Sequence, residues 1–227
     1  MKWLLHGFAV CGTSAGRLHP PRSLESLLWF SLTRFTMKNQ YATYQCQIVG
    51  ATPLLMHNGL LADPINEITK LMKQVSGKRD KTEADFAELS RLEWFGGLYI
   101  QDGLPCLPGE MLEAMLLEAA KKKKKGVQTK AGLIVPHNAM LEYPGPQDID
   151  EMWASKQFMH KIGVRVQRNK VIRTRPIFKE WSAMIEIHYL PSLLNKSDVQ
   201  SFVEIGGQIV GLGDWRPKFG RFEVKEV

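Results

Sequence analysis

Apolar and polar residues alternate with a period of two in several short segments, and this pattern predicts β-strands with one buried face. Residues 44–49 and 181–189 alternate most regularly. Two pairs of strands flank turn signals and so predict hairpins, with turns at Gln101-Asp102-Gly103 and at Asn169-Lys170. The other predicted strands cover residues 98–100, 104–107, 131–143 with a break at 136–138, 162–168, 171–176 and 219–227.

Apolar residues recur with helical spacing in four other segments. Asp63-Pro64 can cap and open the first helix, which runs to about Val75, and the longest helix covers residues 110–125. Its last turn carries the lysine run 121–125, where the helix dipole favours cations. The remaining predicted helices cover residues 81–94 and 198–210, the latter capped by Asp198 or Ser197.

This order of elements predicts an α+β fold whose antiparallel sheet carries helices on one face. A ferredoxin-like, RNA-recognition-type core is the natural candidate. We expect one such domain over residues 37–227, with a helical insertion near 65–96. We expect residues 1–36 to be a poorly ordered leader or an upstream extension, because Met37 stands directly before the first good strand.

Composition narrows the class of protein only moderately. The chain of 227 residues is 44% hydrophobic and has a formal net charge of +7, which suits a globular protein with an anionic partner or none. Its three cysteines are scattered, so we expect a reducing, cytoplasmic setting and no disulfide framework. No apolar segment is long enough to span a bilayer, and no motif predicts a metal or another cofactor.

The second predicted hairpin is rich in cations. Arg165 and Gln167 share a face of its first strand, and Arg173 and Arg175 share a face of its second. Like charges gathered across a hairpin repel one another, so they indicate an anionic partner, although cations also protect sheet edges. The candidate binding residues of this hairpin are Arg165, Arg168, Lys170, Arg173 and Arg175.

The segment before the last strand combines glycines, cations and aromatic residues. Glycine allows positive φ and close backbone approach, cations bind phosphate, and aromatic rings stack on bases. The alternative is a structural turn whose aromatic rings pack into the core. The candidate binding residues of this C-terminal loop are Gly211, Gly213, Trp215, Arg216, Lys218, Phe219, Gly220 and Arg221.

Three motifs together resemble the RAMP superfamily of CRISPR-associated proteins, in particular the backbone subunits that assemble along a guide RNA. The motifs are Thr52-Pro53-Leu54-Leu55-Met56-His57-Asn58-Gly59, Asp63-Pro64-Ile65 followed by Gly103-Leu104-Pro105-Cys106-Leu107-Pro108-Gly109, and the glycine-rich C-terminal loop. After Pro108-Gly109 the family has Ser-Ser-Leu-Lys-Gly, whereas residues 110–114 here are Glu-Met-Leu-Glu-Ala. The resemblance implies RNA as the partner and self-assembly along the strand.

We therefore expect a non-catalytic protein that binds single-stranded RNA or DNA, with RNA favoured. One alternative is a metal-dependent endoribonuclease of the same superfamily. The resemblance places Asp63 at the position of a metal-binding aspartate, and His57 is the acid–base candidate. Another alternative is a phage-type structural or assembly protein whose basic loop contacts a neighbouring subunit.

Overall fold

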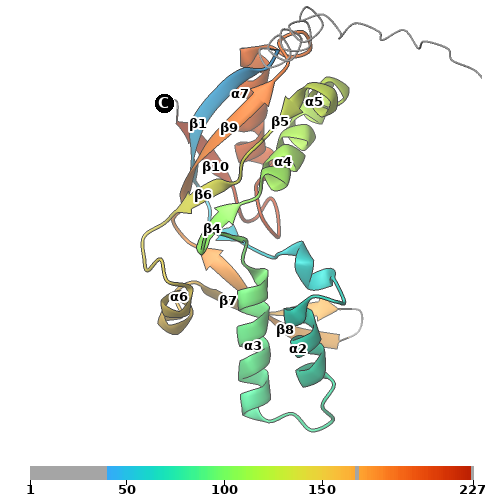
Figure 1. Cartoon of the computed structure of the whole chain (residues 1–227), viewed down its shortest axis with the longest axis vertical. Coiled ribbons are helices and arrows are strands. Elements are labelled where there is room, and N and C mark those ends of the chain that lie inside the picture. The colour runs from blue at the N-terminus through green and yellow to red at the C-terminus, as the bar shows by residue number, and fades with distance from the viewer. Residues whose placement is uncertain (1–39, 167–168, 226–227) are drawn as a thin grey trace, which may run out of the picture. The chain divides into compact units, whose positions relative to one another are not determined.

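The computed structural model describes residues 40–166 and 169–225 (Figure 1). The predicted leader, residues 1–36, therefore lies outside the described residues, and so does Arg168 of the predicted hairpin. The described part has an α+β fold, as predicted, and its strand pairs are antiparallel. None of its helices is both long and apolar enough to cross a membrane.

The larger sheet has the strand order β10-β1-β9-β6-β4-β3, with β5 also paired to β9. Cys46 lies opposite Ile185, and Ile48 lies opposite Ala183; all four side chains are buried. The alternating pattern of β1 and β9 thus gives one buried face, as predicted. The strands are β1 (Ala42–Gly50), β3 (Ile100–Gln101), β4 (Leu104–Leu107), β5 (Leu133–Ile134), β6 (Ala139–Glu142), β9 (Ser182–Tyr189) and β10 (Phe222–Lys225).

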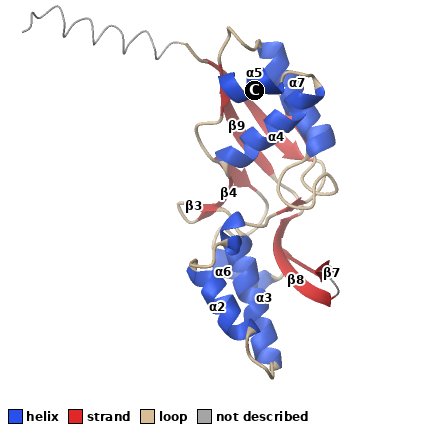
Figure 2. Ribbon diagram, turned by 90° about the vertical axis from the view of Figure 1, so that its right-hand side faces the viewer, coloured by secondary structure: helices blue, strands red, loops and turns tan. Residues whose placement is uncertain are grey.

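Two helices, α4 (Gly109–Lys122) and α7 (Lys196–Ile205), cover one face of this sheet (Figure 2). Burial of one large apolar side chain contributes about 1.5–3 kcal/mol to the stability of the fold, so several such side chains hold these helices against the sheet. The buried side chains that they supply are Leu112, Met115, Leu116, Ala119, Ala120, Val199, Phe202 and Val203.

A second sheet has the order β2-β8-β7, formed by β2 (Leu54–Leu55), β7 (Met159–Val166) and β8 (Asn169–Phe178). The helix α3 (Glu83–Gly97) packs on β8, and α2 (Glu67–Ser76) packs on α3. The indole of Trp94 in α3 donates to the carbonyl of Phe158 at 2.8 Å. These two helices occupy the region where the helical insertion is predicted.

The N-terminal cap of α2 differs from the prediction. Asn66, not Asp63, caps this helix and accepts from the backbone N–H groups of Ile68 and Thr69 at 3.0 and 3.3 Å. The Asp63 carboxylate instead accepts from the N–H of Ile65 at 3.0 Å, directly after a 3₁₀ turn at Gly59–Ala62. Asparagine caps as well as aspartate, and a local turn already uses the Asp63 side chain.

The region after α4 also differs. The helix ends at Lys122, because Lys124 takes a φ of 60°, and a short helix α5 (Gly126–Gly132) follows where the sequence predicts the start of a strand. β5 and β6 then lie on either side of the predicted break at 136–138. Another short helix, α6 (Ile149–Ser155), was not predicted, because seven residues are too few to show a helical period.

Two boundaries late in the chain were placed wrongly. Asn195 caps α7, and Asp198 is its reciprocal capping-box partner three residues later. A π-helix, Gly206–Val210, then completes the helical segment. In the cationic hairpin, Asn169 and Lys170 belong to β8 and pair with Val166 and Arg165, so they are not the predicted turn.

Candidate functional site

The C-terminal loop, residues 211–221, folds back onto the segment that contains β2. The N–H of Asp214 donates to the carbonyl of Leu55 at 2.8 Å, and the N–H of Gly220 donates to the carbonyl of Pro53 at 2.9 Å. Leu212 and Gly220 are also joined by a 2.9 Å backbone hydrogen bond across the base of the loop. The loop is therefore fixed to the second sheet by its own backbone.

The glycines of this loop make that close packing possible. Gly213 and Gly220 have φ values of 72° and 75°, which glycine adopts at little cost. A Cβ atom would lie 2.3 Å from the carbonyl oxygen of Leu55 at the first position and 1.8 Å from that of Leu212 at the second. Gly211 similarly lies against the carbonyl of Phe219. These three glycines close the loop on neighbouring backbone, and the space beside them is filled.

Aromatic side chains form a small cluster at the tip of the loop. The rings of Trp215 and Phe219 are stacked, with centroids 6.0 Å apart and an angle of 14° between the planes. His160 of β7 meets both rings edge-on, and the ammonium of Lys218 lies 5.6 Å from the Trp215 ring. The Trp215 side chain nevertheless remains 41% exposed. It is thus held in place while part of its surface stays open for contact.

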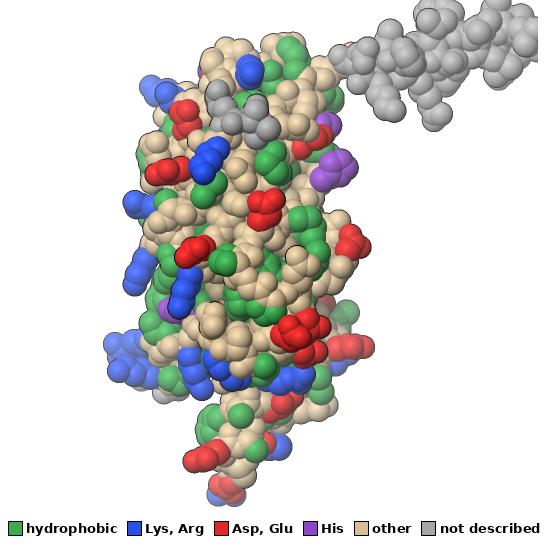
Figure 3. All heavy atoms as spheres, turned by 90° about the vertical axis from the view of Figure 1, so that its left-hand side faces the viewer, with side chains coloured by type: hydrophobic (Ala, Val, Ile, Leu, Met, Phe, Trp, Pro, Cys, Tyr) green, Lys and Arg blue, Asp and Glu red, His purple; other side chains and the backbone are tan. Residues whose placement is uncertain are grey.

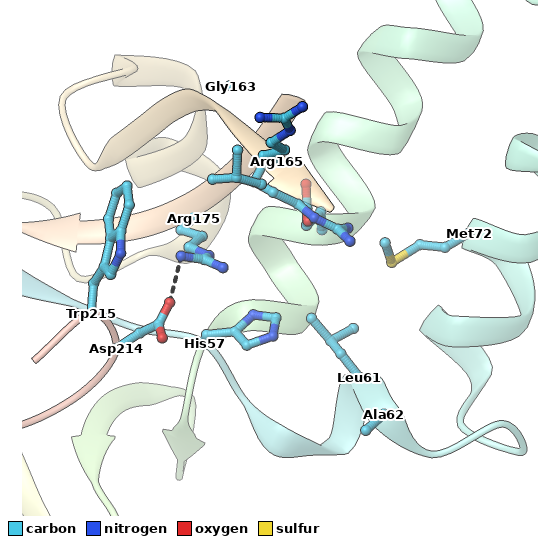
Figure 4. A pocket seen from close by; sticks show the side chains of 12 residues that line it. His57, Leu61, Ala62, Met72, Gly163, Arg165, Arg175, Asp214 and Trp215 are labelled. Atoms are coloured by element: carbon cyan, nitrogen blue, oxygen red, sulfur yellow. Dashed lines mark hydrogen bonds and ion pairs between the residues drawn. The ribbon is translucent and has the colours of Figure 1, made fainter. Parts of the chain in front are cut away.

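A cavity of about 670 Å³ lies between the cationic hairpin, the segment after β2 and the C-terminal loop (Figure 4). The figure shows His57, Arg175, Asp214 and Trp215 around it. Three segments far apart in the sequence therefore bring cations, a histidine and an aromatic ring to one place. The lining residues are His57, Leu61, Ala62, Met72, Glu93, Gly163, Val164, Arg165, Arg173, Arg175, Asp214 and Trp215.

Two of the three arginines of the cavity are paired with carboxylates. Arg175 lies 2.6 Å from Asp214, and Arg173 donates to Glu93 at 2.9 Å. Arg165 forms no ion pair within the described part of the chain. Three cations against two carboxylates leave a formal charge of +1 on the lining, before any protonation of His57. Three of the predicted hairpin arginines thus line the cavity, and carboxylates balance the charge of two of them.

Two histidines near the cavity have lowered pKa values. Burial is the main cause at His57, and the positive charge of Arg175 adds to it against the opposing effect of Asp214 and Glu93. Burial also lowers the pKa of His160, with further contributions from Arg175 and Lys218. Both rings are therefore largely neutral near pH 7, and a bound anion would favour their protonation.

The other predicted cations in the described part of the chain do not line this cavity. Lys170 is directly opposite Arg165 in the hairpin and lines a separate cavity with Phe86 and Ile172. The guanidinium of Arg216 lies 3.6 Å from Glu118 of α4. The side chain of Arg221 donates to the carbonyl of Pro217, within the loop itself. Figure 3 shows Lys and Arg side chains gathered in a band at the level of β7 and β8.

The catalytic candidates do not come together. His57 lines the cavity, whereas Asp63 is not among the lining residues and forms the local turn with Ile65. Within the described residues, no group of three or more His, Cys, Asp or Glu side chains could hold a metal ion. The cavity thus contains three arginines, His57, Trp215 and two engaged carboxylates.

Sequence reasoning missed several residues of the site. Glu93 lies within the predicted helix 81–94, and neither Asp214 nor His160 is among the predicted binding residues, yet Glu93 and Asp214 line the cavity and His160 contacts the rings of Trp215 and Phe219. Asp214 stands between Gly213 and Trp215, so its position within the predicted binding loop could have indicated that it belongs to the site. Nothing in the sequence linked Glu93 with Arg173, because 80 residues separate them. In a comparison with known proteins, the chain matched no protein-family model and no curated protein.

Proposed function

We propose that this protein binds single-stranded nucleic acid, RNA in particular, in the cavity between the cationic hairpin and the C-terminal loop. The observation that carries the proposal is the convergence of Arg165, Trp215 and His57 on one cavity from three separate segments. A strand of nucleic acid offers what this set recognises, which is phosphate for the cations and a flat base for the indole.

Stacking supports a single strand rather than a duplex. An unpaired base exposes its face to an aromatic ring, and such a contact is worth about 1–3 kcal/mol per base. Trp215 is exposed enough to accept one and is held by Phe219 behind it. Bases within a duplex are already stacked on each other and cannot make this contact.

The arrangement of the main sheet supports the resemblance to the RAMP superfamily. The strands β10, β1, β9 and β5 lie side by side in that order; α4 and the short α5 come between β1 and β5, and α7 with the π-helix comes between β9 and β10. This order fits a ferredoxin-like βαββαβ core, with α2, α3 and the second sheet as additions to it. The preference for RNA over DNA rests on that resemblance.

The face of the main sheet opposite α4 and α7 is a less suitable surface for RNA. Glu186 on β9 accepts from Gln45 at 2.6 Å and bonds His188, and Glu142 on β6 accepts from Ser182 at 2.7 Å. Carboxylates repel phosphate, and cations with an aromatic ring lie instead at the hairpin and loop. We therefore place the interface at the cavity and not on the sheet.

A titration of the full-length protein with labelled single-stranded RNA and DNA tests this function. At about 50 and 200 mM salt, we expect binding that weakens with salt. Trp215→Ala should weaken it by about 5- to 100-fold, the equivalent of one stacked base. Phe86→Ala is the matched control, because Phe86 is also an exposed aromatic side chain but does not line the cavity.

The same titration distinguishes the alternatives. Cleavage of the labelled strand in the presence of Mg²⁺ would indicate an endoribonuclease. The absence of binding at low salt would refute the proposal and favour a structural or assembly protein. Arg165→Ala should reduce binding of all sequences alike, whereas Arg79→Ala, an exposed arginine in the turn between α2 and α3, should not.

A further inference from the structure

A second cavity, of about 420 Å³, lies beside the first, and the two share Asp214 and Trp215 in their walls. Both cavities have the size of pockets that hold small ligands. They meet at Asp214 and Trp215, and β2 holds Asp214 in place through the Leu55 carbonyl. The residues lining the second cavity are Glu118, Lys122, Ile209, Val210, Gly213, Asp214, Trp215, Arg216 and Pro217.

The two cavities differ in their chemistry. The first contains the hairpin arginines and His57, whereas the second contains Lys122 from the end of α4 and Arg216 from the loop. Both of these cations are exposed. Two carboxylates also line this cavity: Glu118 lies 3.6 Å from Arg216, and Asp214 is paired with Arg175 of the first cavity at 2.6 Å. The second cavity therefore suits a phosphate group, and its one aromatic side chain is the shared Trp215.

Trp215 is fixed at this boundary by an uncommon backbone conformation. Its φ is 59°, in the left-handed region that side chains other than those of glycine, asparagine and aspartate rarely adopt. The stack on Phe219 and the hydrogen bond from the Phe219 N–H to the Trp215 carbonyl, at 3.3 Å, hold the residue there. A bulky ring kept in such a conformation, yet 41% exposed, indicates a functional constraint on its position.

We propose that Trp215 divides one continuous site into two subsites, so that the smallest well-bound ligand is two consecutive nucleotides of a single strand. One nucleotide occupies the first cavity, with its base on the indole. The next crosses the Trp215 wall, and its phosphate meets Lys122 and Arg216. The inference rests on the proposed function and adds the length of the unit that the site recognises.

Ligand length and two cavity-specific variants test the division. Full-length protein is titrated with uridine and adenosine 5′-monophosphates, the 5′-phosphorylated dinucleotides and the hexanucleotides. We expect the dinucleotides to bind at least about tenfold more tightly than the mononucleotides, since the second cavity adds phosphate contacts. A gain that continues steeply from dinucleotide to hexanucleotide would indicate further subsites along a strand.

The variants separate the two cavities. The double variant Lys122→Ala, Arg216→Ala should weaken the dinucleotides about five- to tenfold and leave the mononucleotides unchanged, whereas Arg165→Ala should weaken both. Lys123→Ala is the matched control, because Lys123 is an exposed neighbour outside the lining. All substituted side chains are exposed, so thermal melting should confirm that the variants fold.

Three outcomes have distinct meanings. Equal affinity for mononucleotides and dinucleotides, or an unchanged dinucleotide affinity in the Lys122→Ala, Arg216→Ala variant, would overturn the two-subsite arrangement and leave the proposed function standing. If the wild-type protein binds none of these ligands, including the hexanucleotides at low salt, the proposed function itself fails, and the division falls with it.

Discussion

Replacing Glu93 with glutamine should destabilise the protein and at the same time strengthen its binding of an anionic strand. Glu93 lies on α3, is 5% exposed, and accepts from the Arg173 guanidinium at 2.9 Å and from the backbone N–H of Thr174 at 2.8 Å. It therefore ties the helical insertion to the cationic hairpin and neutralises one arginine of the cavity.

The structure gives the size of the stability effect. Glutamine keeps a carbonyl for Thr174 but loses the charged partner of Arg173, and a hydrogen bond to a charged group is worth about 1.5–3 kcal/mol. Because the Arg173 side chain is 35% exposed and can regain water, we expect a loss of about 1–2 kcal/mol. Glu93→Ala also leaves the buried Thr174 N–H unpaired and should cost about 2–4 kcal/mol in all.

Binding should change in the opposite direction. Removing the carboxylate raises the formal charge of the cavity lining from +1 to +2 and frees Arg173 for a phosphate. The dependence of log affinity on log salt concentration should steepen by about 0.7 for a single strand. Affinity at low salt should rise accordingly, provided that the variant is still folded at the temperature of the titration.

Urea unfolding and a salt series of RNA titrations measure the two effects. Glu88→Gln is the control, because Glu88 is on the same helix with a side chain that is 46% exposed and only a 4.0 Å contact to Arg91. It should change the free energy of unfolding by less than about 0.5 kcal/mol. An unfolding free energy of Glu93→Ala equal to that of Glu93→Gln, or a salt dependence that does not steepen, would refute this account.

Four further predictions concern the loop, His57 and the hairpin. Gly220→Ala should lower the melting temperature by about 4–8 °C, since a loss of about 2 kcal/mol follows from its φ of 75° and the blocked Cβ position; Gly59→Ala, in open space, should not. Affinity for RNA should rise between about pH 7.5 and 5.5, because bound phosphate raises the lowered pKa of His57, and His57→Gln should reduce this rise. Over the same range the unfolding free energy should fall, because the unfolded chain takes up this proton near its ordinary pKa of 6.5, above that of the folded state; a flat calorimetric profile would contradict the assignment. Lys170→Ala should relieve repulsion with Arg165 and raise stability by a few tenths of a kcal/mol in thermal melts.

The main strands and long helices could be predicted because their patterns are local. β1, β9 and α4 bury alternating or helically spaced residues that are visible in a single segment. The first hairpin could also be predicted, because Asp-Gly is typical of a tight turn with two positive φ angles. Asp102 and Gly103 both take positive φ in the structure. The short helices α5 and α6 have seven residues each, too few to show a helical period, and α5 has no side-chain cap, so they leave little trace in the sequence.

Only part of the candidate site could be predicted from the sequence, because the rest depends on contacts between distant segments. Residue type and clustering indicate Arg165 and Trp215, but they do not reveal which carboxylates the fold brings to the arginines. Glu93 reaches Arg173 because α3 packs on β8, and Asp214 reaches Arg175 because the loop is bonded to Leu55. The glycines were expected to admit a ligand, and in the structure they admit the loop's own backbone.

The pairing of Arg173 and Arg175 with carboxylates should limit how strongly the binding of a strand depends on salt. A cation already bound to a carboxylate releases few counterions from RNA, so Arg173 and Arg175 should add little to the salt dependence. Four other cations can contact a strand: Arg165, Lys122 and Arg216 line the two cavities, and Lys218 lies beside the Trp215 ring. If two to four of them bind phosphate, at about 0.7 each they predict a slope of roughly −1.4 to −2.8. Electrostatics of that size are largely screened at physiological salt, whereas stacking is not. The affinity that survives there should therefore depend on Trp215 more than on any single cation.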